Sequence, residues 1–395
     1  MQPLEAKVQC EQWPASPLLK VAGLAEFAAG TFPPEHMLLD LRDTQVRAAG
    51  PALCHLPWAG FLTDVPEHAP LDRPWIAVPP GAFKIGIGDV VELRPHTSKA
   101  ALRYRRGSNN NILFTTERCN SYCLMCSQPP REVDDGWRVS HLCDLIELID
   151  KNAPSLTVTG GEPTLLKENL RRIVLHCADV LPQTHLHVLS NGRAFGGGIP
   201  AHMFEGLHPF LTWGIPLYGD HYGLHDYVVQ SAGAFSQTIR GLYALEAAKQ
   251  QIEIRVVLVK PVVERLTELA RFIYRNLPFV KHVALMGTEP IGFARAHYDD
   301  LWVDPTDMAP VLTKTVDFLS KRSMRVSLYN LPLCVLPEHL WSYSSKSISD
   351  WKQQYLPACE QCAIKERCGG FFAWATDKWT SRTIKPVRGA LCAKH

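Results

Sequence analysis

The sequence predicts an α/β protein whose core is a partial (β/α)6, TIM-like barrel. Two observations favour this fold class. From residue 111 onward, short apolar runs alternate with segments whose apolar residues recur at helical spacing. Strands that alternate with helices pair in parallel, because each crossover helix returns the chain to the same end of the sheet. Six such units are too few for a closed eight-stranded barrel, so we expect an open one.

Residues 1–105 are predicted to form a small β-rich N-terminal domain. Prolines are frequent, and the segment 82–95 is typical of short strands around a Gly-Asp turn. An exposed strand edge here would accept a peptide, so we expect either docking of a peptide or partner, or simple shielding of the barrel. The basic run Arg103, Arg105 and Arg106 is interpreted as a solvated linker, with a contact to an acidic partner as the alternative.

The core is predicted over residues 106–324. Its six strands are expected at 111–116, 155–159, 185–190, 210–218, 252–260 and 282–287. Helices with one apolar face are expected between them. Two such faces consist of Leu170, Ile173, Val174 and Cys177, and of Leu266, Leu269, Ala270 and Ile273. A helix near 307–322 and a strand at 325–330 follow, and residues 325–395 are assigned to a C-terminal extension.

Three cysteines follow the first core strand. Cys119, Cys123 and Cys126 have the spacing Cys-x3-Cys-x2-Cys. Thiolates are the usual ligands of iron–sulfur clusters, and three thiolates on a four-iron cluster leave one iron open to another ligand. The alternative is a structural zinc site, which needs a fourth ligand such as His141 or Cys143.

A second motif, Gly160-Gly161-Glu162-Pro163, follows the second core strand. The carboxyl ends of parallel strands meet at one edge, so this motif and the cysteines are expected together. Glycines allow close approach of a backbone, and a carboxylate pairs with an ammonium group. A simple turn is the alternative interpretation.

The two motifs together resemble the radical S-adenosylmethionine (SAM) superfamily. The resemblance implies that Cys119, Cys123 and Cys126 are catalytic and bind a 4Fe-4S cluster. It implies that SAM binds the open iron through its amino and carboxylate groups and is cleaved to a 5′-deoxyadenosyl radical. The residues that it assigns to SAM are Gly160, Gly161, Glu162, Pro163, Ser190, Asn191 and Arg255. For Arg255, an outward-facing salt-bridged side chain is the alternative.

This sequence departs from the superfamily pattern at two positions. Met125 stands where an aromatic residue usually precedes the third cysteine. Pro216 stands where related peptide-modifying enzymes offer a serine to SAM, and Tyr218 is nearby. The first departure concerns packing around the adenine rather than cluster ligation.

A second cysteine group, Cys359, Cys362 and Cys368, resembles the C-terminal extensions of peptide-modifying radical SAM enzymes. The resemblance implies an auxiliary 4Fe-4S cluster. A further cysteine of the full motif is replaced by Phe372, which implies a shortened, one-cluster form. We expect Cys334 as the fourth ligand, with Cys392 as the alternative.

The other interpretation of this group is a zinc knuckle. The remaining cysteines are expected to be small apolar residues; they are Cys10, Cys54, Cys143 and Cys177. A group of histidines is interpreted as surface and loop residues, with a substrate contact as the alternative for the last; they are His202, His208, His221 and His225.

Longer phrases resemble the radical SAM maturase of the His-Xaa-Ser system, the C-type member of a maturase pair. They lie at 116–130, 219–242, 253–261 and 347–372. The resemblance implies a ribosomally made precursor peptide as substrate, a second radical SAM maturase as partner, and an electron donor such as flavodoxin or ferredoxin. A small-molecule or tRNA substrate, and an inactive peptide-binding partner, remain alternatives.

Composition narrows the protein class. The net charge of +2 gives no general argument for nucleic acid or an anionic membrane, so neither is expected as a partner. No apolar run approaches the length of a membrane span. The first residues lack the basic and apolar segments of a signal peptide, so a cytoplasmic location is expected.

Overall fold

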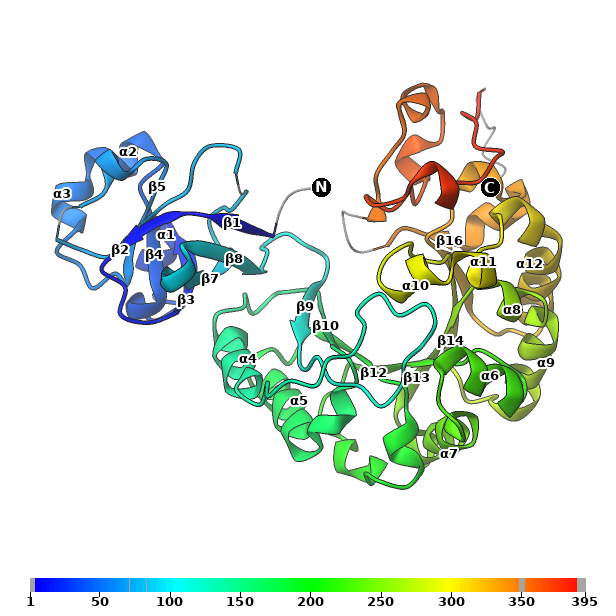
Figure 1. Cartoon of the computed structure of the whole chain (residues 1–395). Coiled ribbons are helices and arrows are strands. Elements are labelled where there is room, and N and C mark those ends of the chain that lie inside the picture. The colour runs from blue at the N-terminus through cyan, green and yellow to red at the C-terminus, as the bar shows by residue number, and fades with distance from the viewer. Residues whose placement is uncertain (1–3, 71, 83, 348–351, 389–395) are drawn as a thin grey trace.

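The computed structural model describes residues 4–70, 72–82, 84–347 and 352–388. Two separate eight-stranded sheets organise this part of the chain. Figure 1 shows the smaller, N-terminal sheet beside one end of a strongly curved second sheet, and the C-terminal extension at the other end. Among the described residues, no helix is both long and apolar enough to span a membrane.

The N-terminal sheet is mixed, with the order β1-β8-β7-β3-β4-β5-β6-β2. Its strands are β1 (Glu5–Lys7), β2 (Gln9–Glu11), β3 (Leu18–Ala22), β4 (Met37–Asp40), β5 (Gly60–Thr63), β6 (Trp75–Ala77), β7 (Val90–Arg94) and β8 (Lys99–Tyr104). The short helices α1 (Leu24–Ala29), α2 (Thr44–Ala48) and α3 (Gly50–Leu53) lie between them. β1 and β2 stand at opposite ends of this order yet only Val8 separates them, so the sheet curls back on itself.

The β-rich character of this region is therefore as predicted, but its details differ. Within 82–95, only β7 forms a strand. β7 pairs with β3 on one side and β8 on the other, so it has no free edge for an added peptide. The expected docking edge at 82–95 was wrong.

The second sheet is entirely parallel, in the order β16-β15-β14-β13-β12-β11-β10-β9. Its strands are β9 (Asn111–Phe114), β10 (Ser155–Thr159), β11 (His185–Leu189), β12 (Leu211–Pro216), β13 (Gln251–Val257), β14 (His282–Met286), β15 (Val326–Tyr329) and β16 (Ser344–Ser345). All six predicted core strands are present. β15, which we had placed in the extension, pairs with β14, and β16 pairs with β15, so two strands lengthen the sheet beyond six.

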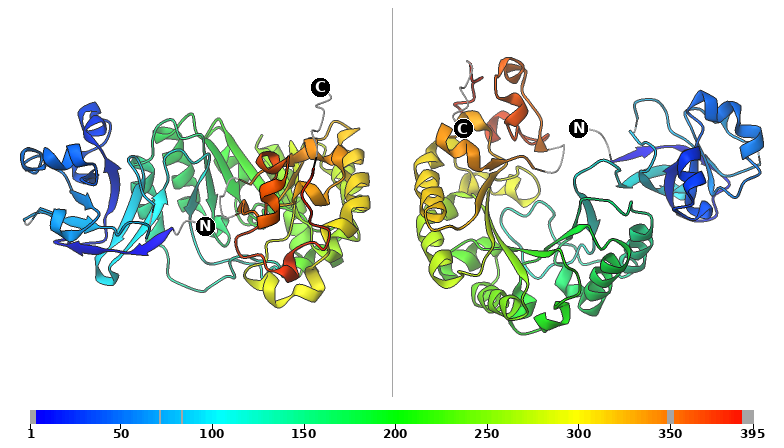
Figure 2. Two further views of the ribbon diagram at one scale, coloured as in Figure 1. Left: turned by 90° about the horizontal axis from the view of Figure 1, so that it is seen from above. Right: turned by 180° about the vertical axis from the view of Figure 1, so that it is seen from behind.

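Helices cover the convex side of this sheet, as Figures 1 and 2 show. The helices of this part of the chain are α4 (Arg138–Glu147), α5 (Glu168–Val180), α6 (Tyr222–Val229), α7 (Ala234–Ala247), α8 (Lys260–Val263), α9 (Leu266–Asn276), α10 (Phe293–Ala296), α11 (Tyr298–Leu301) and α12 (Pro305–Ser320). The buried faces of α5 and α9 consist of the residues predicted for them. The predicted partial-barrel α/β fold is confirmed.

Charged side chains join the two sheets. Lys20 on β3 is completely buried, and its Nζ lies 2.9 Å from Asp150 Oδ1 beyond α4. Arg106 binds the same carboxylate at 2.8 Å and also Glu26, while Arg103 donates to Glu92 at 2.6 Å. The interpretation of the basic run as a solvated linker was wrong for Arg103 and Arg106, because both are paired within the chain.

Candidate functional site

The Cys119 loop, residues 115–137, follows β9 and crosses the carboxyl end of the sheet. Its backbone is fastened to α6, where the N–H groups of Tyr122 and Leu124 donate to the carbonyls of Val229 and Val228 at 3.1 and 3.0 Å. At its other side, Phe293 N donates to Cys126 O at 2.9 Å. The loop is thus held from two helices that flank different strands.

Two glycines that follow β10 lie in close backbone contact with this loop. Gly161 N donates to Thr116 O at 2.7 Å, and Glu162 N donates to Arg118 O at 2.8 Å. A Cβ atom at Gly161 would lie 2.1 Å from Arg118 O, and one at Gly160 would lie 2.5 Å from Thr116 O. Only glycine leaves space for this approach, which explains the Gly-Gly pair physically.

The carboxylate of Glu162 is buried and already well supplied with donors. Its Oε1 accepts from Thr164 N at 2.9 Å, Thr164 Oγ1 at 2.6 Å and Ser190 Oγ at 2.7 Å. Its Oε2 accepts from Asn191 N at 2.6 Å. A carboxylate offers about four acceptor positions over two oxygens, so Oε2 is the atom with capacity for a further donor.

The three thiols of the loop lie near one another in a partly buried region. Burial, and then the nearby Glu162 carboxylate, raise the pKa of Cys119 to about 12. Burial and the neighbouring thiols of Cys126 and Cys119 raise the pKa of Cys123 to about 12. Without a bound metal these side chains are protonated, and Cys126 Sγ donates to Gln128 O at 3.0 Å. Coordination to a metal deprotonates a thiol outright.

The alternative zinc ligands lie elsewhere. His141 Nε2 is 3.9 Å from Glu92 Oε2 of the N-terminal sheet. Burial raises the pKa of the Cys143 thiol. The nearby charge of Arg172 lowers this pKa, and that of Asp144 raises it. Over the described ranges, no three His, Cys, Asp or Glu side chains converge on a point that could hold one metal ion.

The other residues predicted to bind SAM lie at two places in the structure. Ser190 and Asn191 lie beside Glu162, and Asn191 Nδ2 also donates to Asn120 Oδ1 at 2.6 Å. Arg255 lies between the buried Ile254 and Val256 on β13, so it faces the concave side of the sheet. Its Nη1 donates to Glu253 Oε1 at 2.8 Å. Arg255 is therefore salt-bridged, but inside the barrel rather than outward.

Several residues at the site gave no sequence signal. Arg193 donates to Asn120 O and to Ser121 Oγ, the latter at 2.8 Å, and so fixes the start of the Cys119 loop. Asp135 is buried and accepts from Glu117 N at 2.7 Å. Arg193 directly follows the Ser190-Asn191-Gly192 turn, which is the one feature that could have drawn attention to it.

The second cysteine group forms a pocket of its own. Four cysteines line it, namely Cys334, Cys359, Cys362 and Cys368. Backbone N–H groups already donate to two of the sulfurs: Leu333 and Gly370 to Cys368 Sγ at 3.3 and 3.4 Å, and Val387 to Cys362 Sγ at 3.4 Å.

Two other residues were discussed with this group, namely Cys392 and Phe372. Cys392, the alternative fourth ligand, lies outside the described residues. Phe372 is buried.

His225 is also buried, and its Nδ1 accepts from Tyr218 N at 3.2 Å. Burial lowers the pKa of His225 to about 4, so it is neutral near pH 7.

Comparison with known proteins gives a fold likeness only. No family model and no curated protein matches the chain. SuiB from Streptococcus suis bound to S-adenosylmethionine is similar over 65% of this chain and 56% of its own, with 14% identity and a TM-score of 0.45. Native anSMEcpe with bound AdoMet is similar over 55% and 62%, with 18% identity and a TM-score of 0.42. A radical SAM methyltransferase from Sphaerobacter thermophilus matches over 61% and 68%, with 14% identity and a TM-score of 0.39.

The matched region spans about half of another SuiB structure, 49% of its length.

Proposed function

We propose that this chain is a radical SAM enzyme that modifies a ribosomally made peptide of the His-Xaa-Ser type. The observation that carries the proposal is the docking of the Cys119 loop on Gly160 and Gly161. This contact gathers three cysteines and the Glu162 carboxylate at the carboxyl end of a parallel sheet. In parallel α/β proteins this end carries the chemistry.

The residues fit a 4Fe-4S cluster. The loop that carries the three thiols is fastened on both sides, and Cys119 and Cys126 are close enough to Cys123 to raise its pKa. When bound, such a cluster supplies the single electron that cleaves SAM to methionine and a 5′-deoxyadenosyl radical. Glu162 would bind the SAM ammonium through Oε2, and Arg255 would face the carboxylate from β13.

The second group fits an auxiliary 4Fe-4S cluster with Cys334 as its fourth ligand. Four cysteines around one pocket match the ligand number of such a cluster, and N–H donors to sulfur stabilise thiolates. Zinc would accept the same four ligands. The resemblance of residues 347–372 to peptide-maturase extensions favours iron and sulfur.

The peptide substrate rests on the sequence phrases that resemble the His-Xaa-Ser maturase. We propose the N-terminal domain as the docking site for this peptide or for the partner maturase. β1 and β2 each pair with one strand among those described, so strand addition would take place there rather than on β7. An electron donor of the flavodoxin or ferredoxin type completes the proposed set of partners.

The metal assignment is tested on anaerobically reconstituted protein. We expect about eight iron atoms in the wild type and about four after Cys119, Cys123 and Cys126 are replaced by alanine. Cys334→Ala should lower the iron of the second group, whereas Cys10→Ala should not. Retention of all iron in the triple variant would contradict the first cluster, and stoichiometric zinc would contradict the second.

The reaction is tested by mass spectrometry of the precursor peptide, co-expressed with and without this chain. A mass change that requires Cys123 supports the proposal. Formation of 5′-deoxyadenosine without a peptide mass change favours a small molecule or tRNA as substrate. A peptide that is retained in a pulldown, with no SAM cleavage, indicates an inactive binding partner.

A further inference from the structure

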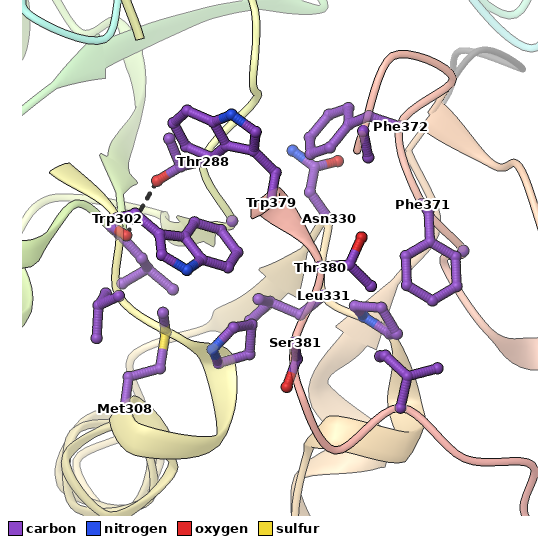
Figure 3. Close-up of a pocket in the computed structure, with 18 residues that line it drawn as sticks. Thr288, Trp302, Met308, Asn330, Leu331, Phe371, Phe372, Trp379, Thr380 and Ser381 are labelled. Atoms are coloured by element: carbon purple, nitrogen blue, oxygen red, sulfur yellow. Dashed lines mark hydrogen bonds between the residues drawn. The ribbon is translucent and has the colours of Figure 1, made fainter. Parts of the chain in front are cut away.

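A pocket lies between the carboxyl ends of β13–β15 and the C-terminal extension (Figure 3). It encloses about 500 Å³, including the space at its mouth. Leu258, Thr288 and Asn330 reach it from the ends of β13, β14 and β15, and Phe371 and Trp379 reach it from the extension. The motifs discussed above do not use it.

The pocket borders the second cysteine group. Phe371 and Pro332 line both this pocket and that of the second cysteine group. Thr288 begins the short loop that ends at Phe293, whose N–H donates to Cys126 O at 2.9 Å. A group held in this pocket would therefore be adjacent to the second cysteine group.

The lining is apolar, aromatic and uncharged. Trp302, Trp379, Phe371 and Phe372 surround the space in Figure 3, and no Asp, Glu, Lys, Arg or His is among its described lining residues. Asn330 adds a polar contact. Ser347 donates to its Oδ1, and among the described residues no hydrogen bond engages its Nδ2. An occupant would need apolar surface and a carbonyl acceptor.

The walls are held rigidly. The ring of Trp379 packs edge-on against Trp302 and Tyr298, with centroids 5.3 and 4.7 Å away. Asp304, which caps α12, accepts from Ser381 Oγ at 2.6 Å and from Arg382 N at 3.0 Å. This holds the segment 376–384 against the barrel. A preformed pocket binds without the entropy cost of ordering its walls.

We propose that this pocket binds an aromatic or branched aliphatic side chain of the peptide substrate, with Asn330 Nδ2 donating to a peptide carbonyl. The proposal rests on the proposed function for the identity of the occupant as a peptide. It names an apolar residue of the substrate as an anchor beside the second cysteine group. Charged side chains are excluded because nothing in the lining would compensate their desolvation.

The test uses the full chain and N-acetyl-4-fluorophenylalanine methylamide as probe, with binding read from broadening of the ¹⁹F NMR signal. Ala375→Phe fills the pocket and should weaken binding at least tenfold. Ala373→Phe, two residues away and outside the lining, is the matched control and should leave it unchanged. Thr380→Phe is a second filling variant, used if Ala375→Phe does not fold.

Three results would overturn the proposal. The first is equal affinity of the wild type and both filling variants for the probe. The second is displacement of the probe by N-acetyl-lysine methylamide at equal concentration, and the third is its displacement by adenosine. The last would assign the pocket to the adenine of SAM. Binding of the probe needs neither iron nor SAM cleavage, so failure of this test is distinct from failure of the proposed function, which 5′-deoxyadenosine formation reports.

Discussion

At the scale of single residues, Gly161 decides whether the Cys119 loop fits against β10. The carbonyl of Arg118 occupies the space that any side chain would need. Backbone cannot move aside as a flexible side chain can, so a methyl group here displaces the loop.

We therefore expect Gly161→Ala to abolish ligation at the first cysteine group while sparing the second. Iron after reconstitution should fall from about eight to about four atoms per chain. Gly86→Ala is the control, because a Cβ there meets nothing within 4 Å. Full iron content in Gly161→Ala would show that the close approach is dispensable.

Glu162→Gln tests the proposed ammonium contact. The variant keeps the shape and removes the charge, so SAM binding should weaken roughly tenfold, and iron content should stay the same. An amide NH2 would also oppose one of the present donors, which costs about 1–3 kcal/mol of stability. Thr164→Ala removes one of those donors without changing the charge and serves as the control in isothermal titration with SAM. Equal SAM affinity in Glu162→Gln and the wild type would exclude the contact.

The roles of cysteines and paired glycines were predictable from the sequence, because few roles suit these residue types. The roles of residues that depend on a partner distant in the sequence were not predictable. Cysteine spacing and the Gly-Gly pair point to their chemistry without a structure. Lys20 gave no such signal, because lysine is almost never fully buried and its partner Asp150 is 130 positions away (150 − 20). The inward direction of Arg255 depended on strand sidedness, which a run of mostly apolar residues does not reveal.

At the scale of elements, Asp304, which caps α12, accepts two of the hydrogen bonds that hold the segment 376–384. Asp304→Ala should destabilise the chain by about 0.5–2 kcal/mol through loss of the helix cap and release this segment. Hydrogen exchange of residues 376–384 should become faster. Asp307→Ala is the control, since it removes an exposed ion pair with Arg382 that contributes little. Equal exchange in the two variants would contradict the role of Asp304.

The strands of the barrel were predictable because both faces of a parallel sheet are covered, which gives continuous apolar runs. Elements outside that rule were missed. α6 is short and contains Gly223 and the exposed Tyr222 and Tyr227, so its apolar residues show no recognisable helical spacing. Most strands of the N-terminal sheet have three to five residues, too few for alternation to be recognised.

At the scale of the whole molecule, Lys20 connects the N-terminal sheet to the barrel. Its Nζ donates to Leu148 O at 2.7 Å and Gly88 O at 3.2 Å, and lies 4.1 Å from the centroid of the Phe32 ring. Burial lowers the pKa of Lys20, although the hydrogen bond to Asp150 opposes this. The ion pair is therefore enclosed between the two sheets.

Lys20→Met should lower the free energy of unfolding by about 1–3 kcal/mol, because it removes one of the two cations that bind the buried carboxylate of Asp150, while Arg106 still pairs with it. Urea denaturation measures this. Lys151→Met, at an exposed neighbour of Asp150, should change stability by less than about 0.5 kcal/mol. A similar unfolding midpoint for Lys20→Met and the wild type would contradict the bridging role.

The same junction changes how a docking role for residues 1–105 can be tested. Deleting them should spare SAM cleavage and abolish peptide modification if the domain only recruits the peptide. However, deletion also removes Lys20 from Asp150 and uncovers apolar residues of the shared core. Substitutions on β1 and β2 that leave Lys20 in place therefore give the cleaner comparison, with mass spectrometry of the peptide as the readout.

The curl of the N-terminal sheet has a consequence for the order in which the protein is made. β1 is synthesised before its partner β8, which follows more than 90 residues later (Lys7 to Lys99). At about 5–20 residues per second, the first strand waits roughly 5 to 20 seconds for its neighbour. Until β8 has been made, the backbone groups of β1 that pair with it in the folded sheet have no partner from that strand.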